Sequence, residues 1–244
     1  MAIYTACAMC CGFGPRNFPN GLRSPTNGVP AGPNGNWLRA VVLARPPAAM
    51  LTKAFLRRAA LARRQALTAA QVAARSQQLS AQLFRHFPVA EWRGLHVFLP
   101  RARRNEPDTG PIIRRIRAEF PAVQVAVPVV QADGISLKNY ALSPSTVLTE
   151  NRWGIPEPAG TPETEMLPAA FDAVLVPLLA VDAAGHRVGY GAGFSDRFLA
   201  QCRPGTQFIG LNVLDEVPRG GIADLRSTDV ALTASLTPGQ VWRF

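Results

Sequence analysis

Two stretches early in the sequence place their apolar residues at helical spacing. Residues 53–67 combine strong helix formers with one apolar stripe, and residues 68–87 do the same behind a Thr-x-x-Gln capping box. The stripes consist of Leu56, Ala60 and Leu67 in the first stretch and of Val72, Leu79, Leu83 and Phe87 in the second. This one-sided spacing predicts two amphipathic helices, and we expect the fold to begin near Thr52.

Four short apolar runs, rich in β-branched residues, follow the two helices. They cover residues 95–100, 123–130, 171–179 and 207–213, with helical candidates at 110–119 and 193–203 between them. Runs that are apolar on both faces and alternate with helices are typical of parallel strands covered on each side. Between 131 and 168, the density of Pro and Gly favours a hairpin and a loop over the sheet edge.

The order of these elements predicts one α/β domain over residues 50–244. We expect an open, mostly parallel sheet with helices on both faces, in a Rossmann-like three-layer arrangement. Residues 1–49 are rich in Gly, Pro and Asn and lack apolar periodicity, so burial cannot offset their ordering entropy. We therefore expect a disordered tail, or a segment that arises from an upstream start codon, with Met50 as the true start.

The formal net charge of +10 says little about partners until it is divided along the chain. Residues 1–50 contain four arginines and no acidic residue, which leaves +6 for the rest. Clustered arginines can bind nucleic acid or a membrane surface, but they also attract polyanionic substrates into a cleft. No apolar run approaches the length of a membrane span, so we expect no membrane partner. The charge of the remaining chain is only moderately basic, and we expect no nucleic acid partner either.

Cysteine usage gives a similar indication of the compartment. Cys7, Cys10 and Cys11 lie in the tail and only Cys202 lies in the body, which does not suit a disulfide framework. No second Cys or His pair follows the tail cluster at zinc-like distance. The sequence therefore predicts a cytoplasmic protein.

Two loops with glycines and charged residues are expected at one edge of the sheet. Residues 106–110 follow the first apolar run, and residues 181–196 follow the third. Ligands of such sheets lie beyond the carboxyl ends of the strands. In the second loop Gly189, Gly191 and Gly193 remove side chains that would keep a phosphate away, and a helix N-terminus follows. A tight structural turn explains the same glycines equally well.

Acidic side chains in these loops allow two interpretations each. Asp196 suits either the N-cap of the following helix or a ligand of Mg²⁺, which prefers oxygen donors. Asp108 or Thr109 is expected to cap the helix that begins near residue 110. Glu106 is left without such a local role and is the better candidate for contacting a ligand.

Five segments together resemble the 5-formyltetrahydrofolate cyclo-ligase family, also called 5,10-methenyltetrahydrofolate synthetase. In order from about Lys53 to Thr233 they are KAFLRRAALARRQAL, FLPRARRNEPDT, NRWGIPEP, FDAVLVPLLAVDAAGHRVGYGAGFSDRFL and DLRSTDVALT. The block around the glycine loop is the most specific. The resemblance implies ATP- and Mg²⁺-dependent closure of 5-formyltetrahydrofolate to the 5,10-methenyl form, with release of ADP and phosphate. It also implies activation of the formyl oxygen by phosphoryl transfer.

The resemblance further implies a role for individual residues. Lys53 and Arg187 are implied as catalytic, and Asp196 and Asp224 as metal ligands. ATP is expected to contact Lys53, Arg57, Arg187, Val188, Gly189, Tyr190, Gly191, Ala192, Gly193, Phe194 and Ser195. The folate is expected to contact Arg101, Glu106, Tyr190, Gly191, Ala192, Gly193 and Phe194. We expect the enzyme to be a monomer.

The sequence departs from the family pattern at two places. Phe194 and Ser195 replace two tyrosines, so an aromatic face remains but both phenol hydroxyls are lost. One extra residue separates Asp224 from Asp229, and Ala223 replaces a His or Asn. These departures motivate a second hypothesis, a folate- or nucleotide-binding paralogue without turnover. A basic RNA-binding protein is a third hypothesis, but the aromatic and basic motifs of common RNA-binding modules are missing.

Overall fold

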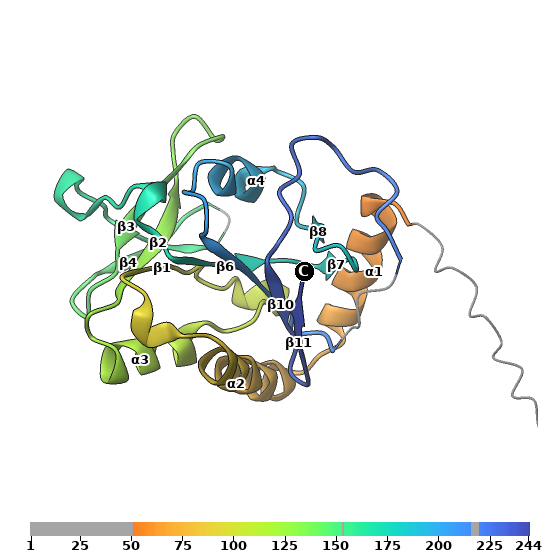
Figure 1. The fold of residues 1–244 in the computed structure, drawn as a ribbon, viewed down its shortest axis with the longest axis horizontal. Helices are drawn as coiled ribbons and strands as arrows, with labels where there is room; N and C mark the ends of the chain where they lie inside the picture. The colour runs from red at the N-terminus through yellow and green to blue at the C-terminus, as the bar shows by residue number, and fades with distance from the viewer. Residues whose placement is uncertain (1–50, 153, 216–219) are drawn as a thin grey trace, which may run out of the picture. The chain divides into compact units, whose positions relative to one another are not determined.

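A computed structural model of the protein describes residues 51–152, 154–215 and 220–244 (Figure 1). The expected tail at 1–49, Met50 and the cysteines Cys7, Cys10 and Cys11 lie outside the described residues. The described chain forms an α/β unit around a seven-stranded sheet. No helix in these ranges is long and apolar enough to span a membrane.

Four α-helices and eleven strands make up this part of the chain. The helices are α1 (Lys53–Gln65), α2 (Ala69–His86), α3 (Gly110–Glu119) and α4 (Phe194–Leu199). The strands of the large sheet are β1 (Gly94–His96), β2 (Gln124–Val130), β3 (Leu137–Ala141), β6 (Ala173–Pro177), β9 (Gln207–Leu211), β10 (Ala234–Leu236) and β11 (Val241–Arg243). Two hairpins pair β4 (Leu148–Glu150) with β5 (Pro156–Pro158) and β7 (Ala180–Val181) with β8 (Arg187–Val188).

The strand order of the large sheet is β11-β10-β9-β6-β1-β2-β3. Its central strands β10, β9, β6, β1 and β2 run parallel. The outermost strands β11 and β3 are antiparallel to their neighbours. At the centre Leu95 pairs with Val125 on one side and with Ala173 on the other. Parallel pairing brings the carboxyl ends of the central strands to one edge, where loops can form a site.

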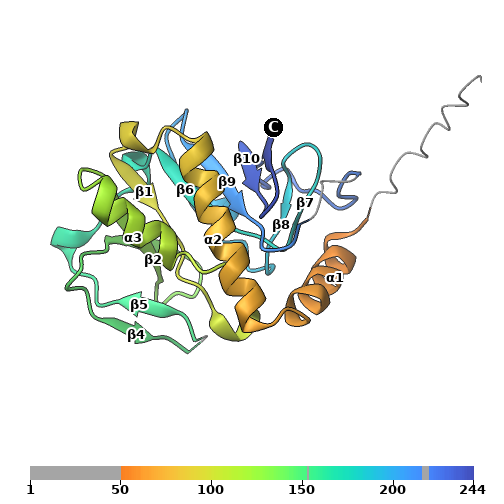
Figure 2. The same ribbon diagram turned by 90° about the horizontal axis from the view of Figure 1, so that it is seen from below.

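Helices cover both faces of the sheet (Figures 1 and 2). Leu95 points into the core cluster formed with α2 and α3 and is fully buried. Its neighbour His96 points to the opposite face, where its ring lies against Phe171 and against Phe198 of α4. Because successive side chains of a strand alternate, β1 separates two apolar layers.

Helix α1 lies across the chain that leaves the carboxyl end of β6 rather than on a sheet face. Thr52 caps it by accepting a hydrogen bond from the Phe55 amide at 3.3 Å. Ala60 packs in a cluster with Leu179 and Leu214. The contacts of α1 with β7 and β8 position it beside the loop that follows β8.

The structure confirms the predicted fold class and the two leading helices, whose second helix carries the predicted capping box. The helical candidate at 193–203 is only partly correct, because α4 ends at Leu199 before a turn at Pro204 and Gly205. The candidate strand at 95–100 is also shorter, although the Val97 amide still donates to Ala126 at 2.8 Å. The sequence did not predict β10 and β11, since strands of three residues are too short to show a pattern.

Candidate active site

One face of α1 carries three basic residues toward the carboxyl edge of the sheet. Lys53, Arg57 and Arg64 are four and seven residues apart, which aligns them along the helix. Each side chain binds a residue more than 120 positions away in the sequence. The helix therefore joins the carboxyl-edge loops to one another through a row of cations.

The glycine loop at 189–193 is held by this row. Arg57 Nε donates to the carbonyl oxygen of Gly189 at 2.9 Å. Gly191 has a φ of 103°, and a Cβ at this position would lie 3.4 Å from the Arg57 guanidinium. Helix α4, which follows, has only six residues, so its dipole is small. Any anion in this loop must rely on side-chain cations more than the sequence suggested.

Arg187 and Asp196 form an ion pair at the two ends of the glycine loop. Arg187 is buried, and its Nη2 donates to Asp196 Oδ1 at 2.8 Å. Its Nη1 binds the carbonyl of Val230, whose amide donates to the same Asp196 oxygen at 3.1 Å. Burial lowers the pKa of the Arg187 guanidinium, and the Asp196 charge opposes this shift. The N-cap interpretation of Asp196 was wrong, because Gly193 occupies the N-cap position.

The C-terminal acidic segment reaches the site through Lys53. The Lys53 ammonium pairs with Asp229, which also lies close enough to Arg187 for an electrostatic interaction. Partial burial opposes the charge of Asp229, but the hydrogen bonds from Lys53 and from the Arg226 amide, with the charges of Lys53 and Arg187, together lower the pKa of the carboxyl. Asp224 is exposed and accepts from the Lys53 backbone amide at 2.7 Å. Asp229 is therefore, after Asp196, the second carboxylate that pairs with a cation of the site. Sequence reasoning gave it no role.

Glu106 has a local role that the sequence did not predict. Its carboxylate is buried, with Oε2 accepting from the Arg101 amide at 2.7 Å. Its Oε1 accepts from Nε and Nη2 of the Arg101 guanidinium at 3.0 and 2.8 Å. The expectation that Glu106 lacks local partners was thus wrong. Of the two predicted caps of α3, Thr109 occupies the N-cap position without a side-chain capping bond, and Asp108 accepts from the Gly110 amide at 2.8 Å.

Tyr190 connects Glu106 and Arg101 to helix α1. The Arg101 guanidinium carbon lies 3.9 Å from the centroid of the Tyr190 ring. Arg64 Nη1 donates to the Tyr190 hydroxyl at 2.8 Å. Burial raises the pKa of Tyr190 to about 12, and the negative charge of Glu106 adds to this effect. The phenol therefore stays neutral at physiological pH.

Arg64 is a part of the site that sequence reasoning missed. It is 1% exposed, and its Nη2 donates to the Leu178 carbonyl at 2.6 Å. Its Nε has no hydrogen-bond partner within the described residues. A buried arginine is costly and usually serves a purpose. Its seven-residue spacing from Arg57 was the available signal, since it places both on one helix face.

The other predicted site residues contribute backbone or exposed surface. Val188 is fully buried in an apolar cluster with Ala180 and Ile222, so its side chain is not available to a ligand. Ala192 is exposed, and Ser195 is half-buried in the first turn of α4. The Phe194 ring lies 5.4 Å from the guanidinium of Arg197. The loop itself therefore supplies few side-chain donors.

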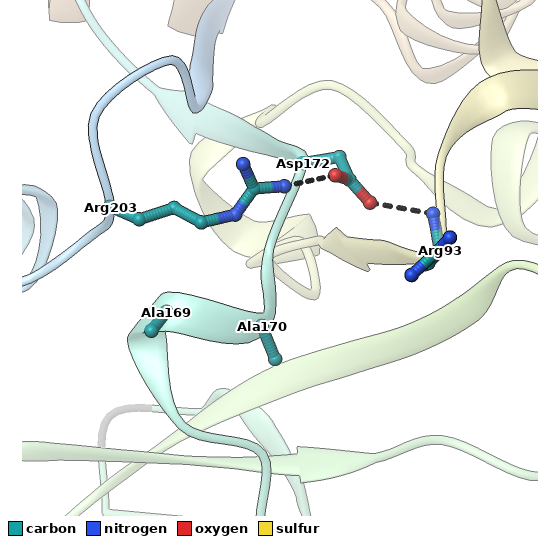
Figure 3. A pocket seen from close by; sticks show the side chains of 5 residues that line it. All are labelled: Arg93, Ala169, Ala170, Asp172 and Arg203. Carbon is teal, nitrogen blue, oxygen red and sulfur yellow. Dashed lines mark hydrogen bonds and ion pairs between the residues drawn. The ribbon is translucent and has the colours of Figure 1, made fainter.

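A cavity of about 580 Å³ lies at the opposite, amino-terminal edge of the sheet (Figure 3). It is lined by Arg93, Ala169, Ala170, Asp172 and Arg203. Asp172 pairs with Arg203 and accepts from the backbone amides of Arg93 and Gly94, at 2.6 and 3.0 Å. These contacts connect the starts of β1 and β6, and the sequence-predicted residues lie elsewhere. Its arginines are exposed, unlike those of the carboxyl edge.

Comparisons with known proteins agree on one family. The sequence profile of the 5-formyltetrahydrofolate cyclo-ligase family matches residues 49–217. The 5-formyltetrahydrofolate cyclo-ligase of Escherichia coli K12 is 30% identical over 191 residues, which cover 75% of this chain and 98% of that protein. The enzyme of the same name from Mycolicibacterium smegmatis is 44% identical over 71 residues, covering 28% of this chain and 34% of the relative.

Solved structures show the same fold. The NMR structure of Aquifex aeolicus 5,10-methenyltetrahydrofolate synthetase has a TM-score of 0.61 and 24% identity, covering 78% of this chain and 92% of that chain. A 5,10-methenyltetrahydrofolate synthetase from Mycoplasma pneumoniae has a TM-score of 0.59 and 20% identity, covering 76% and 98%. From the profile match and the Escherichia coli relative, the chain belongs to the 5-formyltetrahydrofolate cyclo-ligase family of enzymes.

Proposed function

We propose that this protein converts 5-formyltetrahydrofolate to 5,10-methenyltetrahydrofolate, using ATP and Mg²⁺ and releasing ADP and phosphate. The observation that carries the proposal is that Arg57 and Arg187 hold the glycine loop while Lys53 joins them through Asp229. The buried Glu106 and the Tyr190 ring lie next to these cations. Cations suit the phosphates, and a carboxylate beside an aromatic ring suits a pterin edge.

In this proposal Lys53 and Arg57 of helix α1, together with Arg187, bind the phosphates of ATP. Lys53 and Arg187 already neutralise carboxylates, so each can exchange an aspartate for a phosphate oxygen. Arg57 holds the Gly189 carbonyl and keeps the loop open for backbone contact. A Cβ at Gly189 would meet nothing within 4 Å, so the space beside this residue is open. The backbone at Gly189 is therefore accessible to a nucleotide, whereas Gly191 and Gly193 lie against the guanidinium groups of Arg57 and Arg197.

Mg²⁺ fits the acidic residues of this edge. Asp196 engages Arg187 and the Val230 amide through Oδ1 alone, and its Oδ2 accepts no hydrogen bond from the described residues. No group of three or more His, Cys, Asp or Glu side chains gathers within the described ranges. A single free carboxylate oxygen suits Mg²⁺, which keeps several waters and takes its other ligands from phosphates. Asp196 is our proposed ligand, with Asp229 a better-placed second candidate than Asp224.

The chemistry requires the protein to position groups and to neutralise charge. A formamide oxygen leaves poorly, so we propose that the γ-phosphoryl group is transferred to it before the neighbouring amine attacks the formyl carbon. Bound Mg²⁺ would offset charge on the phosphates. Lys53 and Arg187 would stabilise the negative charge that builds up on the transferred group. Glu106 and Tyr190 would hold the pterin so that its formyl group faces the glycine loop.

The test is formation of the methenyl product by the purified full chain. We expect the product absorbance to rise only when 5-formyltetrahydrofolate, ATP and Mg²⁺ are all present. Binding of both ligands without product would instead favour the non-catalytic paralogue that Phe194 and Ser195 suggest. In that case a Ser195→Tyr variant should gain turnover if the missing phenol is the cause.

The remaining expectations concern the form and place of the enzyme. We propose that the enzyme is cytoplasmic, because Cys202 is a free cysteine and the only one within the described residues. We also propose that it is a monomer. Sedimentation at working concentration should give the mass of one chain. A dimer that dissociates together with the loss of activity would contradict this part of the proposal.

A further inference from the structure

The Arg101 side chain lies in a recess between a carboxylate and an aromatic ring. Both of its N–H groups that face Glu106 converge on Oε1, at 3.0 and 2.8 Å. The guanidinium carbon lies 3.9 Å from the centroid of the Tyr190 ring, so the cation packs against the ring. The recess thus binds a small planar group, which donates hydrogen bonds to Glu106 from its edge and packs on the Tyr190 ring with its face.

The walls of this recess are fixed independently of the Arg101 side chain. Glu106 is 4% exposed, and its other oxygen accepts from a backbone amide. The Tyr190 hydroxyl is held by Arg64. Asn105 donates from Nδ2 to the carbonyls of Arg64 and Leu67, at 3.0 and 2.9 Å, and so ties the loop to the end of α1. A preformed site of this kind can exchange its occupant without refolding.

Arg101 is less firmly held than the walls. Its side chain is 21% exposed, and it leads into the exposed residues 102–104. The hydrogen bond from its backbone amide to Glu106 does not depend on where the guanidinium lies. The side chain can therefore leave the recess while Glu106 keeps one partner.

The group that Arg101 offers resembles one edge of the proposed substrate. A guanidinium is a planar carbon flanked by N–H donors, and the 2-amino-4-oxo edge of a pterin presents N–H donors in the same planar N–C–N arrangement. In the proposed function Glu106 and Tyr190 hold the pterin. We propose that Arg101 occupies their recess in the free protein as a mimic of this guanidine-like edge, and that the folate displaces it on binding. This inference rests on the proposed function and adds the competition of Arg101 for the recess.

The inference predicts the direction in which a substitution of Arg101 changes the Kd for the folate. If the side chain contacts the folate directly, its removal weakens binding; if it competes with the folate, its removal strengthens binding. A site that is closed in nine-tenths of molecules lowers apparent affinity about tenfold. We therefore expect Arg101→Met to lower the Kd for 5-formyltetrahydrofolate by roughly five- to tenfold.

The experiment measures the Kd of the full chain for 5-formyltetrahydrofolate at pH 7.5 by calorimetry, without ATP. The matched control is Arg115→Met, because Arg115 also pairs with a glutamate, Glu119, and packs over a ring, Phe84, at 4.2 Å on the outer surface. The control Kd should equal that of the wild type. An unchanged or higher Kd in Arg101→Met, with an unchanged thermal midpoint, would overturn the inference.

A second measurement keeps the inference testable if Arg101→Met does not fold. Pterin and 4-hydroxypteridine, which lacks the 2-amino group, are titrated into the wild-type chain and into Glu106→Gln. Loss of charge-assisted hydrogen bonds is worth roughly 10- to 100-fold in Kd. The wild type should therefore prefer pterin by about this factor, and Glu106→Gln should lose most of the preference. Equal affinity of the wild type for both compounds would contradict the proposed recognition.

These results separate the inference from the proposed function. If the wild type turns over 5-formyltetrahydrofolate but Arg101→Met binds it more weakly, the function stands and Arg101 is a direct substrate contact. If the wild type binds the folate with the expected changes but forms no product, the recess is correct and the ring-closing activity is not.

Discussion

The two edges of the sheet use charged residues in opposite ways. At the carboxyl edge two of the cations are buried: Arg64 is 1% exposed and Arg187 is 7% exposed. At the amino edge Arg203 has a side chain that is 44% exposed, and the carboxylate of Asp172 is the more buried partner. The amino edge nevertheless has an open cavity of about 580 Å³. Desolvated cations therefore mark the candidate site better than cavity volume does.

The reason lies in what each arrangement costs. Asp172 accepts two backbone amides and one guanidinium, so it is well satisfied and needs no ligand. At the carboxyl edge a buried arginine is left with an unpartnered Nε, and Lys53 and Arg187 hold carboxylates that are themselves candidate metal ligands. Such a site is organised to bind charged ligands.

The largest expected effect separates the two edges by activity. Arg187→Met removes a donor from the proposed phosphate site and should lower kcat/KM for ring closure by about 10²- to 10³-fold. Arg203→Met should change it by less than about twofold, since surface substitutions remote from a site are usually near neutral. Steady-state kinetics with both variants checks this, and equal losses in the two would remove the distinction.

The next effect concerns His96, which lies under α4 between the two edges. Burial lowers the pKa of His96 to about 3, and the nearby Asn139 offsets only a part of this shift. The unfolded chain takes up a proton near pH 6.5, so stability is complete above that pH and falls as the pH approaches 3. We expect a loss of roughly 3 kcal/mol between pH 6.5 and 4, at about 1.4 kcal/mol per pH unit.

Urea unfolding of the wild type and of His96→Leu at several pH values measures this effect. The carboxylates titrate alike in both proteins, so the difference in slope isolates the histidine. Parallel pH dependences would show that His96 is not held neutral in the folded protein.

The smallest expected effect is a loss of stability at the amino edge without a loss of activity. Asp172→Ala leaves the amides of Arg93 and Gly94 without their acceptor and should cost about 2 kcal/mol of unfolding free energy. Activity per folded molecule should stay the same. Asp196→Asn should instead lower activity strongly, and it should also lower stability because the buried Arg187 loses its counter-charge. A loss of activity in Asp172→Ala at full folding would place function at the amino edge.

Much of this fold could be predicted from local patterns. The runs that became β2, β6 and β9 are long and apolar on both faces, and α1 to α3 have clear stripes or caps. The edge strands β10 and β11 could not be predicted, because each has three residues and depends on pairing with a strand already in place. Resemblance to the family motif identified the glycine loop at 189–193, but it did not predict which residues the side chains of the site contact.

Side-chain partners were the least predictable part of the site. Glu106 binds Arg101 only five residues away, yet this pairing requires the turn at Asn105, whose φ is 48°. Asp196 was expected as either a cap or a metal ligand, and its partner Val230 is 34 residues away. Arg64 reaches Tyr190 over 126 residues, which no local pattern encodes. These contacts depend on the tertiary fold and not on nearby sequence.

The most direct test of the central claim is hydrogen–deuterium exchange of the full chain with and without Mg²⁺, ATP and 5-formyltetrahydrofolate. We expect ligands to protect residues 52–57, 101–106 and 187–199 together, because these segments surround the carboxyl-edge site. The amino edge at 169–172 and 203–206 should exchange as before. Protection at the amino edge with none at the glycine loop would contradict the account.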